Sequence, residues 1–489
     1  MKFLASVVAV LVMSVPAVAQ PRDPDFPASG KLDRASVVFL DGEGVRSILL
    51  LPEGTSVTVI GRDGPWYRIT FTSSLGNQTG RIAPNHVRLD QGTTSAGGDA
   101  RKVSERGFAE GRGFLFPQEA LNDTTQSFGD GLVRQEVFLK PSRSFQLAAG
   151  VDLRGSSYDQ VEDSWRLDFE DRGTLRPRLA IRRLTASVTT THVSLDLGKQ
   201  FVRWGRADIL SPTDRFAPRD YLNVIENEFL PVLAARGSIH AGGETLEAVW
   251  VPQLTPSRMP LLNQRWTVAP PEAAGFVLED SGAIFPEKSQ QGFRWSHTGR
   301  FEMGLSFFNG FNHLPDLATA VDSTRQVIGV TRSYPELRTF GGEASIPTRV
   351  VTLKGEAAYF TSPDSTSEEY VLYVIEIERQ IGEWLLDGGY AGEIVTTSHP
   401  ELSFAAERGL ARSIIGRASY AIDPRRTVTI EGAVRQDGNG FYARGEFSQA
   451  FGQHWRLTLA GVGLGGEDDD FLGQFQRNSH IFAALRLSY

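Results

Sequence analysis

The chain has 489 residues, no cysteine and a formal net charge of −8 at pH 7. The acidic balance argues against a nucleic-acid partner, which would need a basic surface, and the lack of cysteine excludes disulfide bonds. No segment offers about 18 consecutive apolar residues, so membrane-spanning helices are excluded as well.

The first 19 residues have the pattern of a secretory signal peptide. Lys2 supplies a positive charge, residues 3–15 are almost entirely apolar, and Ala17, Val18 and Ala19 form a small-x-small cleavage pattern. We therefore expect residues 1–19 to be removed and the mature protein to begin near Gln20. Because no cysteine follows, a lipid anchor of the bacterial lipoprotein kind is not expected.

Residues 33–90 are predicted to form a small all-β module. Short apolar runs are separated by turn-forming clusters at near-regular spacing, which predicts five strands; the runs are 37–39, 48–51, 57–60, 67–71 and 81–82. The stretch LLLPEGTSVTVIGRDGPWYRI carries a Gly-Thr pair before a Val-rich strand, and Trp66 and Tyr67 before a second hydrophobic strand. In these features the module resembles bacterial SH3 domains.

That resemblance implies a binding module with peptidoglycan or a periplasmic protein as partner. Trp66 and Tyr67 are its candidate aromatic residues, although a half-buried core position is the alternative for Trp66. Arg81 departs from the family, which usually has tryptophan after the glycine at this point, and this puts an aromatic groove in doubt. Residues 91–103 follow as a flexible linker, rich in glycine, serine and threonine.

From residue 104 to 489 the pattern changes to long segments of period two, which predict strands with one apolar and one polar face. In the last segment Ile481, Ala483, Leu485 and Leu487 alternate with His480, Arg486 and Ser488. Three features distinguish a membrane barrel from a soluble sandwich. The segments run about 10 to 12 residues, their polar faces mix arginines with carboxylates, and aromatic residues lie near their ends; examples are Tyr359, Trp384, Phe441, Trp455 and Tyr489.

Turn lengths give a strand count. Short and long connections tend to alternate, and in bacterial barrels the short ones face the periplasm. To keep short and long connections in alternation, residues 326–347 must form a single strand and an extra strand must lie near residues 107–116. The fold class is therefore all-β, a transmembrane antiparallel β-barrel of about 16–18 strands preceded by the SH3-like barrel. Eighteen is the first expectation and 16 its rival.

The C-terminus supplies a further sign. The chain stops on Tyr489, with Leu487 and Leu485 at the alternate positions before it. This resembles the C-terminal signal by which the barrel assembly machinery recognises bacterial outer-membrane barrels.

The densest charge lies in residues 198–231, where prolines exclude a continuing strand. If this loop folds inward, its mixed charges set a transverse field and narrow the pore; a surface loop held by its own salt bridges is the alternative. The candidate constriction residues are Arg203, Arg206, Asp208, Asp214, Arg215, Arg219 and Asp220.

Other candidates are weaker. Residues 251–266 either cap the mouth or form an ordinary outer loop, and Asp468, Asp469 and Asp470 lack the spacing of a calcium loop. No metal-ligand spacing, nucleophile elbow or phosphate loop is present, so no cofactor, no metal and no catalytic residue is predicted. A hydrolase is the remaining alternative. It would be indicated if His454 or His480, near the barrel rim, lay beside a serine or aspartate of another strand.

Overall the chain resembles porin-like outer-membrane barrels of Gram-negative bacteria. The resemblance implies an outer-membrane location, contact with outer-membrane lipid, and passage of small hydrophilic solutes, with residues 33–90 in the periplasm. The alternative is a barrel that serves as an anchor, with the SH3-like module as the functional part.

Overall fold

The computed structural model describes most of the mature chain. The described residues are 28–32, 36–40, 48–51, 54–63, 66–73, 76–82, 87–89, 103–142, 144–208, 210–269, 273, 275–363, 367–398 and 405–489. The predicted signal peptide and the predicted linker up to residue 102 lie outside them.

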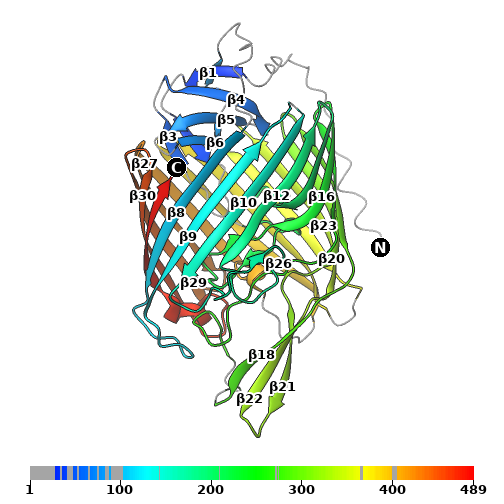
Figure 1. The fold of residues 1–489 in the computed structure, drawn as a ribbon, viewed down its shortest axis with the longest axis vertical. Coiled ribbons are helices and arrows are strands. Elements are labelled where there is room, and N and C mark those ends of the chain that lie inside the picture. Colours follow the sequence, from blue (N-terminus) through cyan, green and yellow to red (C-terminus); the bar gives the residue numbers. More distant parts are fainter. Residues whose placement is uncertain are drawn as a thin grey trace.

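The main body is a closed barrel of eighteen long antiparallel strands (Figure 1). The prediction of eighteen strands is confirmed, and the rival count of 16 is excluded. In chain order the strands are β8 (Val103–Leu115), β9 (Ser127–Leu139), β10 (Phe145–Ser156), β12 (Leu179–Thr189), β13 (Val193–Gln200), β16 (Val232–Ala241), β17 (Glu244–Val251), β19 (Gln290–Thr298), β20 (Glu302–Phe311), β23 (Glu336–Pro347), β24 (Thr352–Thr361), β25 (Glu369–Ile381), β26 (Trp384–Thr397), β27 (Ser413–Asp423), β28 (Arg426–Arg435), β29 (Gly440–Phe451), β30 (Trp455–Gly466) and β31 (His480–Ser488).

The barrel closes between its last and first strands. β31 pairs with β8 from Ile481 opposite Leu115 to Ser488 opposite Phe108, so no strand edge is left open along this seam. Neighbouring strands are joined alternately by short turns and longer loops, which defines a short-turn end and a long-loop end. A two-residue strand, β11 (Leu167–Asp168), adds a parallel pairing to β12.

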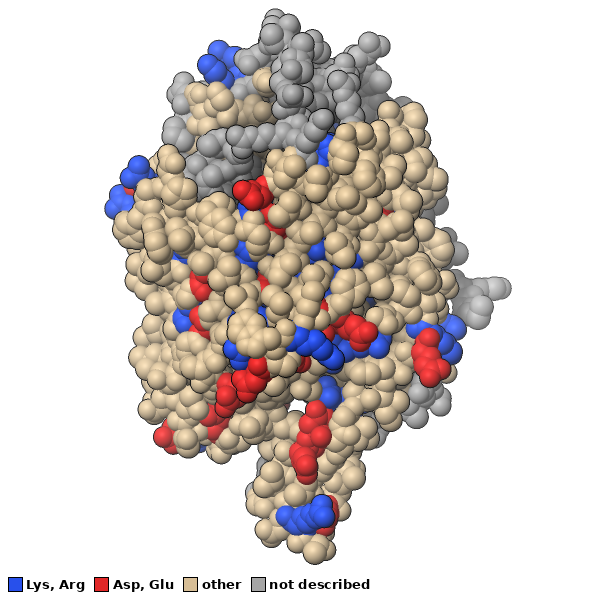
Figure 2. Space-filling model, in the orientation of Figure 1, with Lys and Arg blue, Asp and Glu red and all other residues tan. Residues whose placement is uncertain are grey.

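The two faces of the wall differ as the period-two pattern predicts. Ile414 is 64% exposed and Ile430 62% exposed on the outside, although both are aliphatic. On the inside Glu376 is fully buried and Arg182 nearly so. Figure 2 shows a largely uncharged wall in this view, with charged side chains gathered toward the long-loop end. An apolar exterior and a polar interior are what a membrane-spanning barrel requires.

Three of the predicted end aromatics lie on the outer face at the short-turn end. Trp384 and Trp455 begin β26 and β30, and Tyr489 follows β31; each exposes a large part of its side chain. Tyr489 also joins the seam, because its backbone exchanges two hydrogen bonds with Gly107, of 3.0 and 3.1 Å. Leu485 lies on the same outer face. The role of this terminus in assembly stays a prediction.

Two of the long loops contribute a sheet that the sequence analysis did not predict. It contains β18 (Val277–Ile284), β22 (Val327–Ser333) and β21 (Asp316–Asp322), in that order. Figure 1 shows it extending away from the barrel at the long-loop end. Residues 326–347 therefore supply one barrel strand, β23, as predicted, and one strand of this outer sheet.

The N-terminal residues form a seven-stranded sheet of their own, in the order β3-β2-β6-β5-β4-β1-β7. Five of its strands contain the predicted runs, and β1 and β7 are additional. The strands are β1 (Ala28–Leu32), β2 (Ser36–Leu40), β3 (Ile48–Leu51), β4 (Ser56–Asp63), β5 (Trp66–Ser73), β6 (Gly76–Ile82) and β7 (Val87–Leu89). Tyr67 is buried in its core with Val59 and Ile69, whereas the side chain of Trp66 lies outside the described part.

In the described part of the chain, two 3-10 helices lie in long loops, η3 (Ala406–Arg408) and η4 (Gly473–Asn478). Over the described ranges, no helix is long and apolar enough to cross a membrane.

Candidate functional site

Residues 201–231, here called the inward loop, leave β13 at the long-loop end and pack inside the barrel. Val202, Trp204 and Phe216 are almost completely buried against inward-facing side chains of the wall, including Phe308 and Phe360. Phe216 meets Trp204 and Phe308 edge to face, with ring centroids 5.1 and 5.0 Å apart. Burying large aromatic side chains inside the lumen anchors the loop strongly.

Two inward-facing glycines make room for this packing. A Cβ atom on Gly292 of β19 would lie 2.6 Å from the Trp204 ring and 2.8 Å from the Phe216 ring. A Cβ on Gly341 of β23 would lie 2.6 Å from a methyl carbon of Thr213. Glycine at these two positions thus permits the loop to approach the wall more closely than any other residue would.

The first half of the loop meets a stretch of wall rich in carboxylates. These buried groups, here called the acidic wall, come from five adjacent strands; they are Glu302, Glu343, Glu356, Glu376, Glu378 and Asp387. Arg206 of the loop forms ion pairs with Glu302 and Glu343, the second at 2.9 Å. The backbone N–H of Asp208 donates to both oxygens of Glu376 at 3.0 Å.

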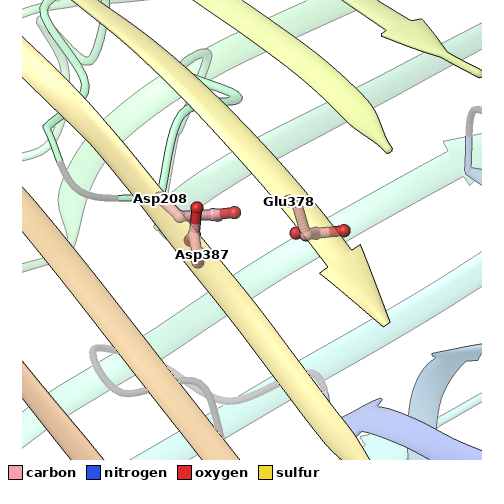
Figure 3. Close-up of side chains that lie close together, drawn as sticks. All are labelled: Asp208, Glu378 and Asp387. Carbon is pink, nitrogen blue, oxygen red and sulfur yellow. The ribbon is translucent and has the colours of Figure 1, made fainter. Parts of the chain in front are cut away.

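Three carboxylates gather at one point of the acidic wall (Figure 3). Oxygens of Asp208, Glu378 and Asp387 lie within 4.8 Å of one another. The ammonium group of Lys354 lies 2.5 Å from Asp208 and 2.7 Å from Glu378. A protein cation therefore already contacts two of the three carboxylates in this cluster.

The second half of the loop meets guanidinium groups. Arg112, Arg134, Arg154 and Arg182, here called the arginine wall, project from β8, β9, β10 and β12. All four approach the carboxylate of Glu228 in the loop, with N–O distances of 3.7, 3.6, 3.0 and 3.9 Å. Arg112 and Arg134 have closer partners on the wall itself, Glu110 at 2.6 Å and Asp152 at 2.7 Å. A cavity of about 30 Å³ remains between this part of the loop and β8–β10. It has room for about one water molecule, so the loop lies close against the wall.

The two walls face each other across the lumen. Around the ring of eighteen strands, β8 to β12 are the first to fourth and β20 to β26 the ninth to thirteenth. The loop spans the distance: Arg206 and Asp208 meet the acidic wall, and Glu228 meets the arginine wall. Such an arrangement sets a field across the lumen.

A buried ion-pair chain holds the middle of the loop to its neighbours. Asp220 accepts two hydrogen bonds from Arg176, at 2.9 and 3.0 Å, and one from Arg258 at 3.1 Å. Arg258 also pairs with Asp171 at 2.8 Å, and Asp171 with Lys199 of β13 at 2.7 Å. Burial alone would raise the pKa of Asp220, but the guanidinium groups of Arg176 and Arg258 outweigh it and hold this pKa below the ordinary value.

Two neighbouring carboxylates of the loop have opposite pKa shifts. Burial raises the pKa of Glu226 despite its contact with Arg444. Burial acts in the same direction on Glu228, but Arg154, Arg134 and Arg112 together hold its pKa well below the ordinary value. Glu228 is therefore the more firmly ionised of the two.

The predicted constriction residues do not form one cluster. Arg206 and Asp208 reach the acidic wall, and Asp220 lies in the buried ion-pair chain, while Asp214 accepts backbone N–H groups of Trp204 and Gly205 within the loop. Arg203 pairs with Asp214 at 3.2 Å and stacks on the Phe229 ring, as does Arg219. Arg215 pairs with Glu407 at 2.8 Å.

Sequence reasoning missed the partners of these residues on the wall. Glu356, Glu376 and the arginine wall occupy ordinary polar positions of alternating strands, so nothing in one sequence separates them from other lumen residues. His313 was missed as well. Its two ring nitrogens lie 2.9 and 2.6 Å from the carbonyl oxygens of Thr255 and Arg215, so it bridges two other loops. The inward glycines at 292 and 341 are the one signal that was available.

The weaker candidates have structural contacts. Trp266 packs beside Phe475 inside the long-loop end, and Asp470 pairs with Arg435 at 2.7 Å and accepts N–H groups at the start of η4. His480 lies among phenylalanine rings and contacts the carbonyl of Asn478, whereas His454 contacts the carbonyl of Ser488. Within the described ranges neither ring has a hydrogen bond to a serine or aspartate side chain.

Comparison with known proteins gives likeness in structure alone. No family model and no curated relative matches the chain. OpdQ of Pseudomonas aeruginosa matches with a TM-score of 0.46 at 9% identity, covering 79% of this chain and 98% of that one. OccAB4 of Acinetobacter baumannii matches with a TM-score of 0.46 at 10% identity, covering 79% and 97%. A mutant of the porin from Rh. blastica has a TM-score of 0.37 at 9% identity, covering 79% and 100%.

Proposed function

We propose that the protein is an outer-membrane channel through which small hydrophilic solutes pass, and that the inward loop is its constriction. One observation carries the proposal: a charged loop crosses a wide barrel and joins two walls of opposite sign. A barrel of this strand number is wide enough to enclose an aqueous passage. The loop then decides the size and charge of what passes.

The exterior supports the location. A belt of aliphatic side chains surrounds the barrel, and Trp384 and Trp455 lie where a membrane interface would place aromatic residues. The short-turn end then faces the periplasm, and Figure 1 places the N-terminal sheet beside that end. We place this sheet in the periplasm and the outer three-stranded sheet outside the cell.

Solute uptake into liposomes tests the proposal. Liposomes with the refolded mature protein should admit small sugars and amino acids at rates that fall steeply with solute size. Equal rates for all sizes would argue against a constriction, and no uptake by demonstrably folded protein would argue against a channel. Folding is checked by gel mobility, because a closed barrel migrates differently before and after boiling.

The alternative function is a barrel anchor for the N-terminal module. It is favoured by the separate core of that module, which includes Val59, Tyr67 and Ile69. In this account the SH3-like residues 33–90 bind peptidoglycan or a periplasmic protein. Full-length protein should then sediment with purified peptidoglycan, and a variant without residues 28–90 should not; equal sedimentation of the two would reject this role.

A further inference from the structure

The geometry points to Glu356 as the positioning residue that fixes the inward loop against the wall, and so sets the cross-section of the proposed channel. The inference rests on the proposed function for its effect on transport, but its structural part is independent of transport. Glu356 lies in β24 and is 3% exposed.

Four donors of the loop converge on this carboxylate. The backbone N–H groups of Arg206 and Ala207 donate to Oε2 at 3.0 and 3.1 Å. The backbone N–H and the hydroxyl of Thr213 donate to Oε1, both at 2.8 Å. Each oxygen therefore accepts two hydrogen bonds, and the two donor pairs come from opposite ends of one turn of the loop.

An ionised carboxylate matches this set of partners, because it has two oxygens that accept and no group that donates. Glutamine has the same shape, but its amide nitrogen would leave at least one backbone N–H of the loop without an acceptor. Buried donors without an acceptor are costly, and hydrogen bonds to charged groups are stronger than neutral ones.

The same turn also lies close to β23 at Gly341. An ideal Cβ at Gly341 would lie 3.4 Å from the Cβ of Thr213, which is close to the Cβ separation of about 3.5–4.5 Å in disulfides. Because the chain has no cysteine, the pair Thr213→Cys with Gly341→Cys would give a tether that a reductant can release. Such a tether can substitute for Glu356 without restoring its charge.

Hydrogen exchange of the backbone amides over residues 202–216, measured by mass spectrometry on the refolded barrel, tests the inference. Glu356→Gln keeps one accepting oxygen, so it should speed exchange by about tenfold or more only at the amides that face its nitrogen, which are those of Arg206 and Ala207 or that of Thr213. The matched control is Glu431→Gln. Glu431 is also a lumen carboxylate, and its partners are Tyr442 at 2.6 Å and Arg417 at 3.8 Å on the wall.

Rescue separates positioning from general stability. In the variant that combines Glu356→Gln with the two cysteine substitutions, slow exchange should return when the disulfide is oxidised and vanish on reduction. Current noise in planar bilayers should follow the same pattern. Unchanged exchange in Glu356→Gln, or equal acceleration in Glu431→Gln, would overturn the inference.

Two further outcomes are distinguishable. If wild-type protein carries no current while the exchange results hold, the channel function fails and the role of Glu356 stands. If Glu356→Gln does not assemble, Thr213→Val decides, because it removes one of the four donors. A smaller acceleration around residue 213 supports the inference, and its absence overturns it.

Discussion

The two ends of the inward loop are held by different chemistry. At the acidic wall the groups of the loop are mainly backbone N–H groups, whose position depends on the path of the chain rather than on side-chain identity. At the arginine wall one side chain, Glu228, meets four guanidinium groups. The first attachment fixes where the loop lies, whereas the second mainly sets the local charge. Substitutions should therefore separate loop position from ion selectivity.

The largest expected effect comes from the buried chain between the two ends. Asp220→Ala would leave Arg176 and Arg258 without their shared carboxylate, and breaking a buried pair costs about 3–5 kcal/mol. Thermal unfolding of the loop region, followed by hydrogen exchange, should show this loss. Asp163→Ala is the control, because Asp163 is fully exposed where it meets Arg178, and exposed pairs contribute little. Equal effects of the two variants would contradict the account.

A smaller effect is expected where the loop packs on glycine. Gly341→Val would crowd both Thr213 of the loop and Ser306 of β20, and overpacking of this kind costs about 1–3 kcal/mol. The loop should exchange faster while the barrel still resists unfolding in detergent. Gly445→Val is the matched control, because a Cβ at Gly445 would meet nothing within 4 Å. If Gly341→Val behaves like the control, the close approach of loop and wall is wrong.

The arginine wall should respond in selectivity rather than in loop position. Glu228→Gln removes one negative charge beside four guanidinium groups, and we expect about 1 kcal/mol in favour of anions, the value for two unit charges about 4 Å apart in bulk water. Reversal potentials in a salt gradient should show the anion-to-cation permeability ratio rising roughly fivefold. Exchange over residues 202–216 should change little; a large change there would mean that both ends position the loop.

Acid should distinguish Glu226 from Glu228. Burial raises the pKa of Glu226, so on acidification it loses its charge before an ordinary glutamate does. The pKa of Glu228 lies well below the ordinary value, so Glu228 keeps its charge after Glu226 has been neutralised. A step in selectivity at a pH above 4.5 should therefore vanish in Glu226→Gln and persist in Glu228→Gln. The reverse pattern in reversal potentials would contradict the assignment.

Acid should break the ion pairs of Asp220 in the buried ion-pair chain only at lower pH. The folded-state pKa of Asp220 is depressed, so its contribution to stability is complete above the ordinary value of 3.8 and is lost as the pH falls through the folded value. The contribution of Asp220 to loop packing should thus survive the neutralisation of Glu226. Reversal potentials should therefore change at a higher pH than the one at which hydrogen exchange detects the loss of the Asp220 ion pairs.

Much of the barrel could be predicted because its residues alternate strictly between lipid and lumen. A period of two, together with the parity of short turns, placed the strand near 107–116 and the closing strand at the C-terminus. The outer sheet could not be predicted in this way. β18 and β22 pair across more than forty residues of chain, and their short apolar runs lie in segments whose length indicated loops.

The candidate site was predicted only in part, for a physical reason. The prolines and charges of residues 198–231 indicated a special loop, but an inward path depends on groups that it meets across the lumen. Glu356 and Arg154 look like any polar residue of an alternating strand. Only the inward glycines, such as Gly341, could have indicated close packing. Whether such a glycine faces the lumen or the lipid is known only when the pairing register of its strand is known.

Single-channel conductance in planar bilayers tests the central claim most directly. Refolded mature protein should be compared with a variant in which residues 203–229 are replaced by a short Gly-Ser linker. The account predicts steady ohmic steps for both, with a clearly larger conductance and weaker ion selectivity when the loop is removed. Equal conductance for the two would show that the inward loop does not constrict the passage, and would contradict the account.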